Sequence, residues 1–259
     1  MDRVPRRKHL GVPNIEPQPL LRVLCVAPAW NEGERISRAV RSVPLDIMTT
    51  VLVVDDGSTD GTATSAEQAG AAVLRHKMNR GVGAAIRSGI DFGLANGYDV
   101  VAVISGGGKT PAEQIPGLLG PILSGEAEMV QGSRYLRGGV AQHMPWHRRF
   151  GTRAYSALFS LLAGARVTDA SSGFRAMRVT LFADRRINLW QPWLDRYELE
   201  PYLLFQALRF GHKVKEVPVT IAYPPKAQGS GRNYTKMRGV FDWWRIFRPV
   251  LFLALRLKR

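Results

Sequence analysis

Two adjacent carboxylates follow an apolar run in the first quarter of the chain. Residues 51–54 are aliphatic and mostly β-branched, which is typical of a strand buried on both faces of a parallel sheet. Asp55 and Asp56 stand where this strand ends, and Gly57 follows them. Because ligands of open α/β sheets bind outside the carboxyl ends of the strands, the two acids are placed to face a ligand. The alternative is that they only cap the turn.

A glycine-rich loop with one lysine follows a second apolar run, residues 100–104. The loop Ser105-Gly-Gly-Gly-Lys-Thr110 is similar to a P-loop, but Val103 stands where that motif needs its first glycine. Pro111 also follows at once. These departures exclude a P-loop nucleotide hydrolase, although the loop amides and Lys109 could still hold a phosphate.

A shorter glycine motif, Asn79-Arg-Gly-Val-Gly83, opens a predicted helix. A dinucleotide-binding fingerprint would need its third glycine where Ile86 stands, so the motif is weak evidence for a dinucleotide. Glycines at the start of a helix nevertheless allow a phosphate to approach the backbone amides.

Apolar periodicity predicts the elements that position these loops. Strands are expected at 20–27, 51–54, 72–74, 100–104, 129–130 and 214–223. Helices are expected at 36–43, 59–70, 79–96, 113–124, 150–162 and 197–210, and loops at 138–146, 168–175 and 224–238. The alternation predicts an α/β fold with a central, mostly parallel sheet flanked by helices.

The composition is ordinary except for its charge. The 259 residues carry a formal net charge of +15, which indicates an anionic partner such as a phosphate-rich ligand or an acidic membrane surface. Nucleic acid is not expected as the partner, because the positive charge gathers in tails and loops without a recognition module. The single cysteine, Cys25, lies in an apolar run and fits a reducing compartment. Residues 1–20 resemble a basic flexible arm rather than a signal peptide.

The C-terminal segment predicts an amphipathic helix kinked at Pro249. Its polar stripe contains Asp242, Arg245, Arg248, Arg256 and Arg259, and tryptophan and other apolar residues occupy the remaining surface. A basic, tryptophan-rich helix suits a membrane interface, and its arginines make it too polar to span a bilayer. The alternative is a helix docked on the protein's own sheet or on a second subunit in a homodimer.

Six motifs taken together resemble the family 2 glycosyltransferases of the GT-A fold, and the polyprenyl-phosphate sugar synthases most of all. The motifs are Pro28-Ala-Trp-Asn-Glu32, Val54-Asp-Asp-Gly-Ser-Thr-Asp-Gly-Thr62, Asn79-Arg-Gly-Val-Gly83, Gly132-Ser-Arg-Tyr135, Ser172-Gly-Phe-Arg175 and Glu216-Val-Pro-Val219. The resemblance implies a Rossmann-like glycosyltransferase domain at 21–225, with a nucleotide-binding half (21–110) and an acceptor half (111–225). Residues 226–259 would then form a basic loop and the amphipathic C-terminal helix.

The same resemblance implies which residues hold a nucleotide-sugar donor with a UDP or GDP carrier. The implied donor-binding residues are Pro28, Trp30, Glu32, Val54, Asp56, Arg80, Ser105, Gly106 and Gly107. Among them, Trp30 would supply a flat surface, and Val54 and Asp56 would read the base. Arg134, Arg175 and Lys236 would face phosphates of the donor or of a lipid acceptor, a task that suits the fork of arginine.

One departure from the family concerns the metal. The resemblance implies an Asp-x-Asp that holds Mg²⁺ or Mn²⁺ after the strand 100–104, but this chain has Ser105-Gly106-Gly107 there. Diphosphate departure needs its developing negative charge neutralised. Three alternatives follow: a metal held by fewer protein ligands, replacement of the metal by Lys109 and Arg134, or a silent domain that only binds nucleotide. We favour a working enzyme with a weakened or absent metal site.

The expected reaction is sugar transfer with inversion at the anomeric carbon. A polyprenyl phosphate acceptor is already ionised and needs no strong base, whereas a soluble small-molecule acceptor with a hydroxyl or an amine needs one. Asp169 is the first candidate for that base and Glu198 the second, although an acid also favours a helix start. With a lipid acceptor, the protein is expected in the cytoplasm, peripherally bound to the inner face of the membrane.

Overall fold

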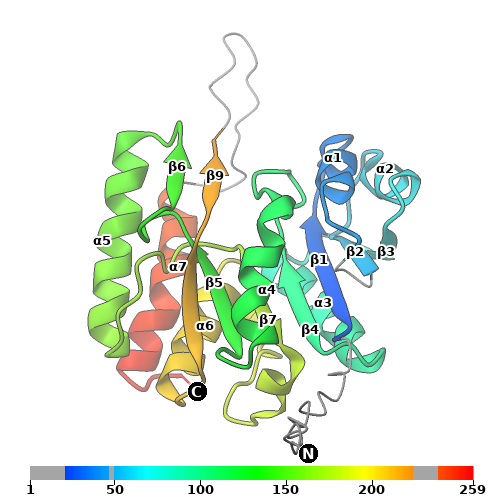
Figure 1. The fold of residues 1–259 in the computed structure, drawn as a ribbon. Helices are drawn as coiled ribbons and strands as arrows, with labels where there is room; N and C mark the ends of the chain where they lie inside the picture. The colour runs from blue at the N-terminus through cyan, green and yellow to red at the C-terminus, as the bar shows by residue number, and fades with distance from the viewer. Residues whose placement is uncertain (1–20, 47–49, 224–238, 259) are drawn as a thin grey trace, which may run out of the picture.

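A seven-stranded sheet forms the centre of the molecule. The computed structural model describes residues 21–46, 50–223 and 239–258, with side chains for 239–241 excepted. The strands are β1 (Val23–Ala29), β2 (Thr50–Asp55), β3 (Ala72–Arg75), β4 (Val100–Val103), β5 (Met129–Ser133), β7 (Arg175–Arg178) and β8 (Val214–Pro218). Their order across the sheet is β3-β2-β1-β4-β7-β5-β8, and only β7 runs antiparallel to its neighbours (Figure 1). The predicted mostly parallel sheet is confirmed.

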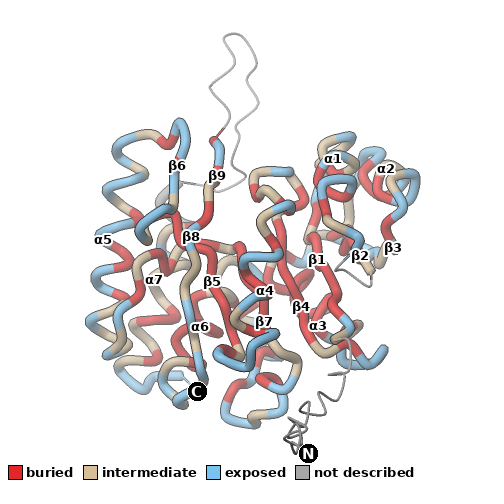
Figure 2. The backbone as a smooth tube through the Cα atoms, in the orientation of Figure 1, coloured by how far each residue is buried: buried red, intermediate tan, exposed pale blue. Residues whose placement is uncertain are grey.

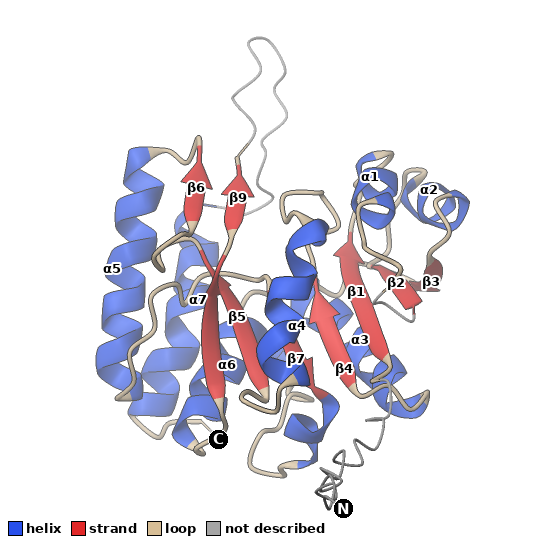
Figure 3. Cartoon of the chain, viewed as in Figure 1, coloured by secondary structure: helices blue, strands red, loops and turns tan. Residues whose placement is uncertain are grey.

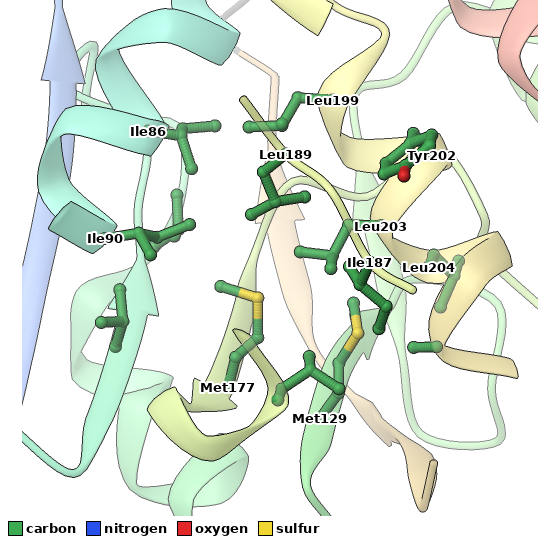
Figure 4. Close-up of a cluster of buried hydrophobic side chains, with 14 of the residues drawn as sticks. Ile86, Ile90, Met129, Met177, Ile187, Leu189, Leu199, Tyr202, Leu203 and Leu204 are labelled. Atoms are coloured by element: carbon green, nitrogen blue, oxygen red, sulfur yellow. The ribbon is translucent and has the colours of Figure 1, made fainter. Parts of the chain in front are cut away.

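Helices cover both faces of this sheet. They are α1 (Arg35–Arg41), α2 (Thr62–Gln68), α3 (Val82–Ala95), α4 (Ile115–Leu123), α5 (Trp146–Ala163), α6 (Leu199–Arg209) and α7 (Gly239–Ala254). One buried apolar cluster joins the sheet to α1, α2 and α4. The other joins it to α3, α5, α6 and α7, and Figure 4 shows its part between α3 and α6. Figure 2 shows the buried sheet between two half-exposed helical layers.

The central strands form because their residues are apolar on both faces. Residues 24–27 of β1 are completely inaccessible to solvent, as parallel strands between two helical layers require. Cys25 lies among them as a free thiol, and burial raises its pKa to about 12. The burial of Cys25 agrees with its place in an apolar run of the sequence.

The prediction missed strand β7. The segment 168–175 is expected as a polar loop, but Arg175–Arg178 pairs with β4 on one side and β5 on the other. The sequence Arg-Ala-Met-Arg contains no apolar run. The two arginines can nevertheless lie in a strand inside the sheet, because both donate hydrogen bonds to carbonyl groups of the protein. The antiparallel strand therefore lies inside the sheet without the pattern of a buried strand.

A second, two-stranded sheet was also missed. Residues 138–146 are expected as a loop, but β6 (Val140–Gln142) pairs in parallel with β9 (Thr220–Ala222). The expected single strand 214–223 is therefore divided between two sheets. The break follows Pro218, which has no N–H to continue the ladder.

The C-terminal helix lies against the body of the protein. Val250 and Leu253 of α7 are buried, and Phe247 packs edge-on against Tyr155 of α5, with ring centroids 4.8 Å apart. Figure 1 shows α7 beside α5 and α6. The prediction that this helix lies on a membrane is therefore wrong for these apolar residues, and the alternative of a helix docked on the protein itself is the observed one. Of the helices in the described residues, none is long and apolar enough to cross a membrane.

Candidate active site

A pocket of about 630 Å³ opens at the carboxyl ends of the parallel strands. Residues at or just past the ends of β1, β2, β4 and β5 line one side of it, and residues of α5, α7 and the segment before α6 line the other. This is the edge at which open α/β sheets bind ligands. The pocket size matches that of sites for molecules of nucleotide size.

Most of the residues implied by the sequence line this pocket. They are Pro28, Trp30, Glu32, Asp56, Ser105, Gly106, Gly107, Lys109, Arg134 and Arg175. Three others are not brought into it: Val54 is fully buried in the core, the side chain of Arg80 is exposed, and Asp169 lies beneath the lining. Lys236 lies outside the described residues.

Asp56 organises the turn that precedes α3. One carboxylate oxygen accepts hydrogen bonds from the backbone N–H of Arg80 at 2.9 Å and from His76, and the other accepts one from Gly81 at 2.7 Å. Asp55 caps its own turn by accepting a bond from the N–H of Ser58. The two acids thus differ: Asp55 is structural, whereas Asp56 sits at the pocket wall with its position set by two amides.

The glycines of the Asn79–Gly83 motif serve the protein's own packing. A Cβ on Gly83 would lie against the carbonyl oxygen of Leu194 and 2.5 Å from that of Arg196. The backbone N–H of Ala84, in the first turn of α3, donates to the carbonyl oxygen of Asp195 at 2.9 Å. The sequence predicts that these glycines let a phosphate approach. In the structure, the space beside Gly81 and Gly83 is filled by the backbone of residues 194–196, which brings Arg196 to the pocket.

The loop carrying Trp30 and Glu32 is anchored on the segment after β2. The N–H groups of Asn31 and Glu32 donate to the hydroxyls of Ser58 and Thr62 at 2.9 and 2.8 Å. Asn31 has a left-handed backbone with φ of 49°, which asparagine tolerates better than most residues. Ser58 and Thr62 therefore hold this loop at the rim of the pocket. The indole of Trp30 is 37% exposed there.

Arg134 is bound tightly to Asp169 beneath the pocket. The Nε atom donates to Oδ2 at 2.6 Å and Nη2 donates to Oδ1 at 2.7 Å, while the Ser171 hydroxyl also accepts from Nη2 and the Tyr223 hydroxyl accepts from Nη1. Burial opposes the charge, but the hydrogen bonds and charge of Asp169 more than offset it and raise the pKa of Arg134. Four of the five N–H donors of this arginine are thereby used.

Arg175 is also held by the protein itself. It is buried on β7, donates to the carbonyl oxygens of Glu200 and Ser172, and lies 3.7 Å from the Glu200 carboxylate. Burial lowers its pKa, and the neighbouring Glu200 opposes that shift. Its buried Nε has no hydrogen-bond partner among the described residues, and the residue lines the pocket.

Comparison with known proteins agrees with this geometry. The model of glycosyl transferase family 2 matches residues 25–186, which is more than half of the chain. The chain belongs to glycosyl transferase family 2. It is 31% identical over 213 residues to the polyprenol monophosphomannose synthase of Mycolicibacterium smegmatis, covering 78% of each chain. It is 33% identical over 209 residues to the undecaprenyl-phosphate mannosyltransferase of Micrococcus luteus, covering 77% of this chain and 83% of the relative.

Solved structures support the fold of this glycosyltransferase. Glucosyl-3-phosphoglycerate synthase from Mycobacterium tuberculosis, in complex with Mn²⁺, uridine diphosphate and phosphoglyceric acid, matches with a TM-score of 0.65 at 21% identity. The match covers 91% of this chain and 78% of that one. The predicted GT-A fold and glycosyltransferase activity are thereby confirmed at the level of the family.

Several lining residues of the glycosyltransferase were missed in the sequence. Arg148 of α5, Arg196, and Arg245 of α7 add three cations to the pocket, and Glu200 and Asp242 add two acids. The pattern of α7 contained a signal, because Asp242, Arg245 and Arg248 share one stripe. The sequence favours a membrane surface as the partner of this helix, whereas in the structure the stripe faces the protein itself.

Glu198 forms ion pairs with the arginines of this stripe and so holds the stripe against the protein. Its carboxylate is buried and accepts a hydrogen bond from Arg248, and Arg245 lies 3.7 Å away. Burial raises the pKa of Glu198, while Arg248 and Arg245 oppose the shift. A buried carboxylate between two arginines fixes α7 beside the pocket, and it is poorly placed to take a proton from an acceptor.

Proposed function

We propose that this glycosyltransferase moves a sugar from UDP or GDP to a polyprenyl phosphate, with inversion at the anomeric carbon. Two relatives that carry polyprenol or undecaprenyl phosphate in their names align over more than three quarters of the chain, which supports this acceptor. The donor half of the pocket supports a nucleotide, because an indole and a carboxylate-ordered turn stand at the ends of β1 and β2.

The observation that carries the proposal is the way Asp169 is used. Its carboxylate is fully buried and receives two hydrogen bonds from the guanidinium of Arg134, one from the backbone N–H of Arg134 and one from Ser171. A carboxylate in that position serves as the anchor of an arginine and is out of reach of an acceptor hydroxyl. A phosphate acceptor removes the need for a base, since its oxygen is already ionised at neutral pH.

The lining on the acceptor side is suited to such an anion. Arg148 and Arg245 approach from α5 and α7, and Arg175 of β7 also lines the pocket. These side chains would orient the acceptor phosphate so that one of its oxygens attacks the sugar from the face opposite the departing diphosphate, which gives inversion. Asp169 acts as a positioning residue for Arg134. Lys236 stays a candidate phosphate ligand.

A lipid acceptor requires contact with a membrane, and α5 offers a surface for it. Trp146, Phe150 and Leu161 of this helix are 81%, 72% and 78% exposed, and Leu158 is 36% exposed. Figure 2 shows α5 at the edge of the molecule with its outer surface exposed. The neighbouring exposed residues Arg149 and Arg153 complement anionic lipid headgroups.

We propose that this outer face of α5 rests on the cytoplasmic face of the membrane. The free thiol of Cys25 is compatible with that reducing side. A second copy of the chain is the other occupant that this apolar face would fit, and it would produce a homodimer.

The proposed function is tested by following a labelled sugar into the organic phase. Purified enzyme is incubated with a panel of labelled UDP- and GDP-sugars, detergent and undecaprenyl phosphate, and the mixture is extracted with butanol. At least one donor is expected to give labelled lipid that mild acid hydrolyses. Label that stays in the aqueous phase with every donor, but moves to phosphoglyceric acid or another soluble acceptor, would contradict the lipid acceptor.

A further inference from the structure

The pocket lacks the acids with which the resemblance implies a metal is held. At the carboxyl end of β4 stand Ser105, Gly106 and Gly107, which offer one neutral hydroxyl and no carboxylate. Within residues 21–46, 50–223 and 239–258, no group of three histidine, cysteine or acidic side chains could hold a metal ion. Mg²⁺ at a diphosphate is held by one or two protein carboxylates together with phosphate oxygens and waters, and residues 105–107 supply no carboxylate, so they do not fit a resident Mg²⁺ or Mn²⁺ ion.

The acids that line the pocket already have cationic or amide partners. Glu32 pairs with Arg35 at 2.9 Å and Asp242 with Arg245 at 3.1 Å. Asp56 is bound by His76 and two amides, as described above. Glu200, the fourth, lies 3.7 Å from Arg175. Of these four, Glu32 lies beside Gly107 at the end of β4, and its charge is paired with that of Arg35.

The packing around the two glycines is tight. A Cβ on Gly106 would lie 2.5 Å from the carbonyl oxygen of Pro28 on β1. A Cβ on Gly107 would lie 3.1 Å from the Glu32 carboxylate, so an aspartate there would place two negative charges side by side. The loop that carries Glu32 thus fills the space beside Gly107.

The glycine-rich loop 105–110 also brings a lysine to the pocket. Gly108 takes a left-handed backbone with φ of 70°, and its N–H donates to the carbonyl oxygen of Ser105 at 3.0 Å. The hydroxyl of Thr110 closes the turn by accepting from the N–H of Ser105 at 3.2 Å. This turn sets Lys109 in the pocket lining at the end of β4, among the residues of the donor side. Unlike Arg134, it is only partly buried.

We propose that this enzyme binds the diphosphate of its donor without a divalent metal, with the Lys109 ammonium group taking the place of the ion. The proposal rests on the proposed function, since it concerns the same donor site. In the transfer, the acceptor phosphate oxygen forms a bond to the anomeric carbon, and the bond from that carbon to the donor diphosphate breaks. The electron pair of the broken bond leaves on the nucleoside diphosphate, and Lys109 neutralises that charge.

The test is calorimetric titration of UDP and of GDP into the full-length protein, in EDTA and in Mn²⁺. One nucleotide is expected to bind with dissociation constants that agree within about three-fold in the two buffers. In EDTA, Lys109→Ala is expected to weaken binding about ten-fold or more, because a charge-assisted contact to phosphate is lost. Lys109→Arg, which keeps the charge, is expected to retain most of the affinity. Lys213→Ala removes an exposed lysine outside the pocket and serves as the control.

The outcomes separate this inference from the function on which it rests. Binding in Mn²⁺ but not in EDTA would overturn the inference and leave the proposed function standing. Unchanged affinity of Lys109→Ala in EDTA would also overturn it, provided that the melting temperature shows the variant folded. Absence of binding of both nucleotides in both buffers would overturn the donor assignment, and the inference with it.

Discussion

Arg134 and Asp169 form a two-point ion pair in the interior of the protein, 35 residues apart in the chain. Their closest atoms are 2.6 Å apart, and their side chains are 4% and 0% exposed. The pair joins the end of β5 to the segment that precedes β7, and Tyr223 and Ser171 complete its hydrogen bonds. The ion pair therefore holds these two segments together beneath the pocket.

Loss of one partner of this pair is expected to be costly. Asp169→Ala leaves the guanidinium buried without a counter-charge and should lower the free energy of unfolding by about 3–5 kcal/mol. Glu67→Ala breaks the exposed pair of Glu67 with Arg75 and should cost less than about 1 kcal/mol. Urea denaturation followed by circular dichroism measures both. Equal, small losses in the two variants would show that the interior pair does not stabilise the fold.

A methyl group at Gly83 is expected to disturb both the fold and the site. Gly83→Ala would press its Cβ against the carbonyl oxygen of Leu194, at a cost of about 1–3 kcal/mol, and displace the segment that carries Arg196. Gly120→Ala on α4 meets no atom within 4 Å and should stabilise the protein by about 0.5–1 kcal/mol. Chemical denaturation of the two variants checks the opposite signs. A neutral or stabilising Gly83→Ala would refute the close approach of these backbones.

The buried thiol of Cys25 predicts a pH dependence in the alkaline range. Its pKa is raised by burial from 9.0 to about 12, so the native state keeps a proton that the unfolded state loses above pH 9. The stability contributed by the neutral thiol is therefore complete below pH 9 and declines as the pH rises toward 12. Cys25→Ala should show a shallower decline than the wild type in urea titrations from pH 8 to 10.5. Identical slopes, or rapid alkylation of the native thiol at pH 8, would contradict the burial of Cys25.

The outer face of α5 is expected to carry membrane binding. Replacing Trp146, Phe150 and Leu161 by serine should reduce co-sedimentation with anionic vesicles about ten-fold or more. Each replacement removes an apolar side chain that would be buried in the membrane interface. Serine at Leu45, Met78 and Leu94, which are exposed elsewhere, is the matched control and should leave binding unchanged. Vesicle binding that survives in the α5 variant would place the membrane contact elsewhere. A dimer in solution that the α5 variant dissociates would assign this face to a second copy of the chain.

The sequence predicted the fold where its pattern was repetitive. The strands β1, β2 and β4 are aliphatic on both faces, so they are buried only when helices cover both sides of the sheet. The position of the pocket follows from the edge at which their carboxyl ends lie. Strand β7 could not be predicted in this way, because Arg175 and Arg178 are satisfied by carbonyl groups distant in sequence.

The roles of charged residues were harder to predict than the place of the site. The stripe of α7 showed that Arg245 and Arg248 share a side, but the pattern does not say what covers that side. The answer depends on Glu198, which is 50 residues from Arg248 and carries no motif. In the same way, Asp169 lies beside a family motif, yet only the structure shows that Arg134 uses both of its oxygens.

The central claim is that the enzyme glycosylates a lipid phosphate whose oxygen needs no activation. The most direct test compares undecaprenyl phosphate with undecaprenol, the same lipid with a hydroxyl, as acceptors for one labelled nucleotide-sugar under identical detergent conditions. The account predicts that label enters the lipid phase with the phosphate and not with the alcohol. Equal transfer to both lipids, or transfer to the alcohol alone, would contradict it, because the site would then have to supply a base, and the two predicted candidates, Asp169 and Glu198, are buried in ion pairs.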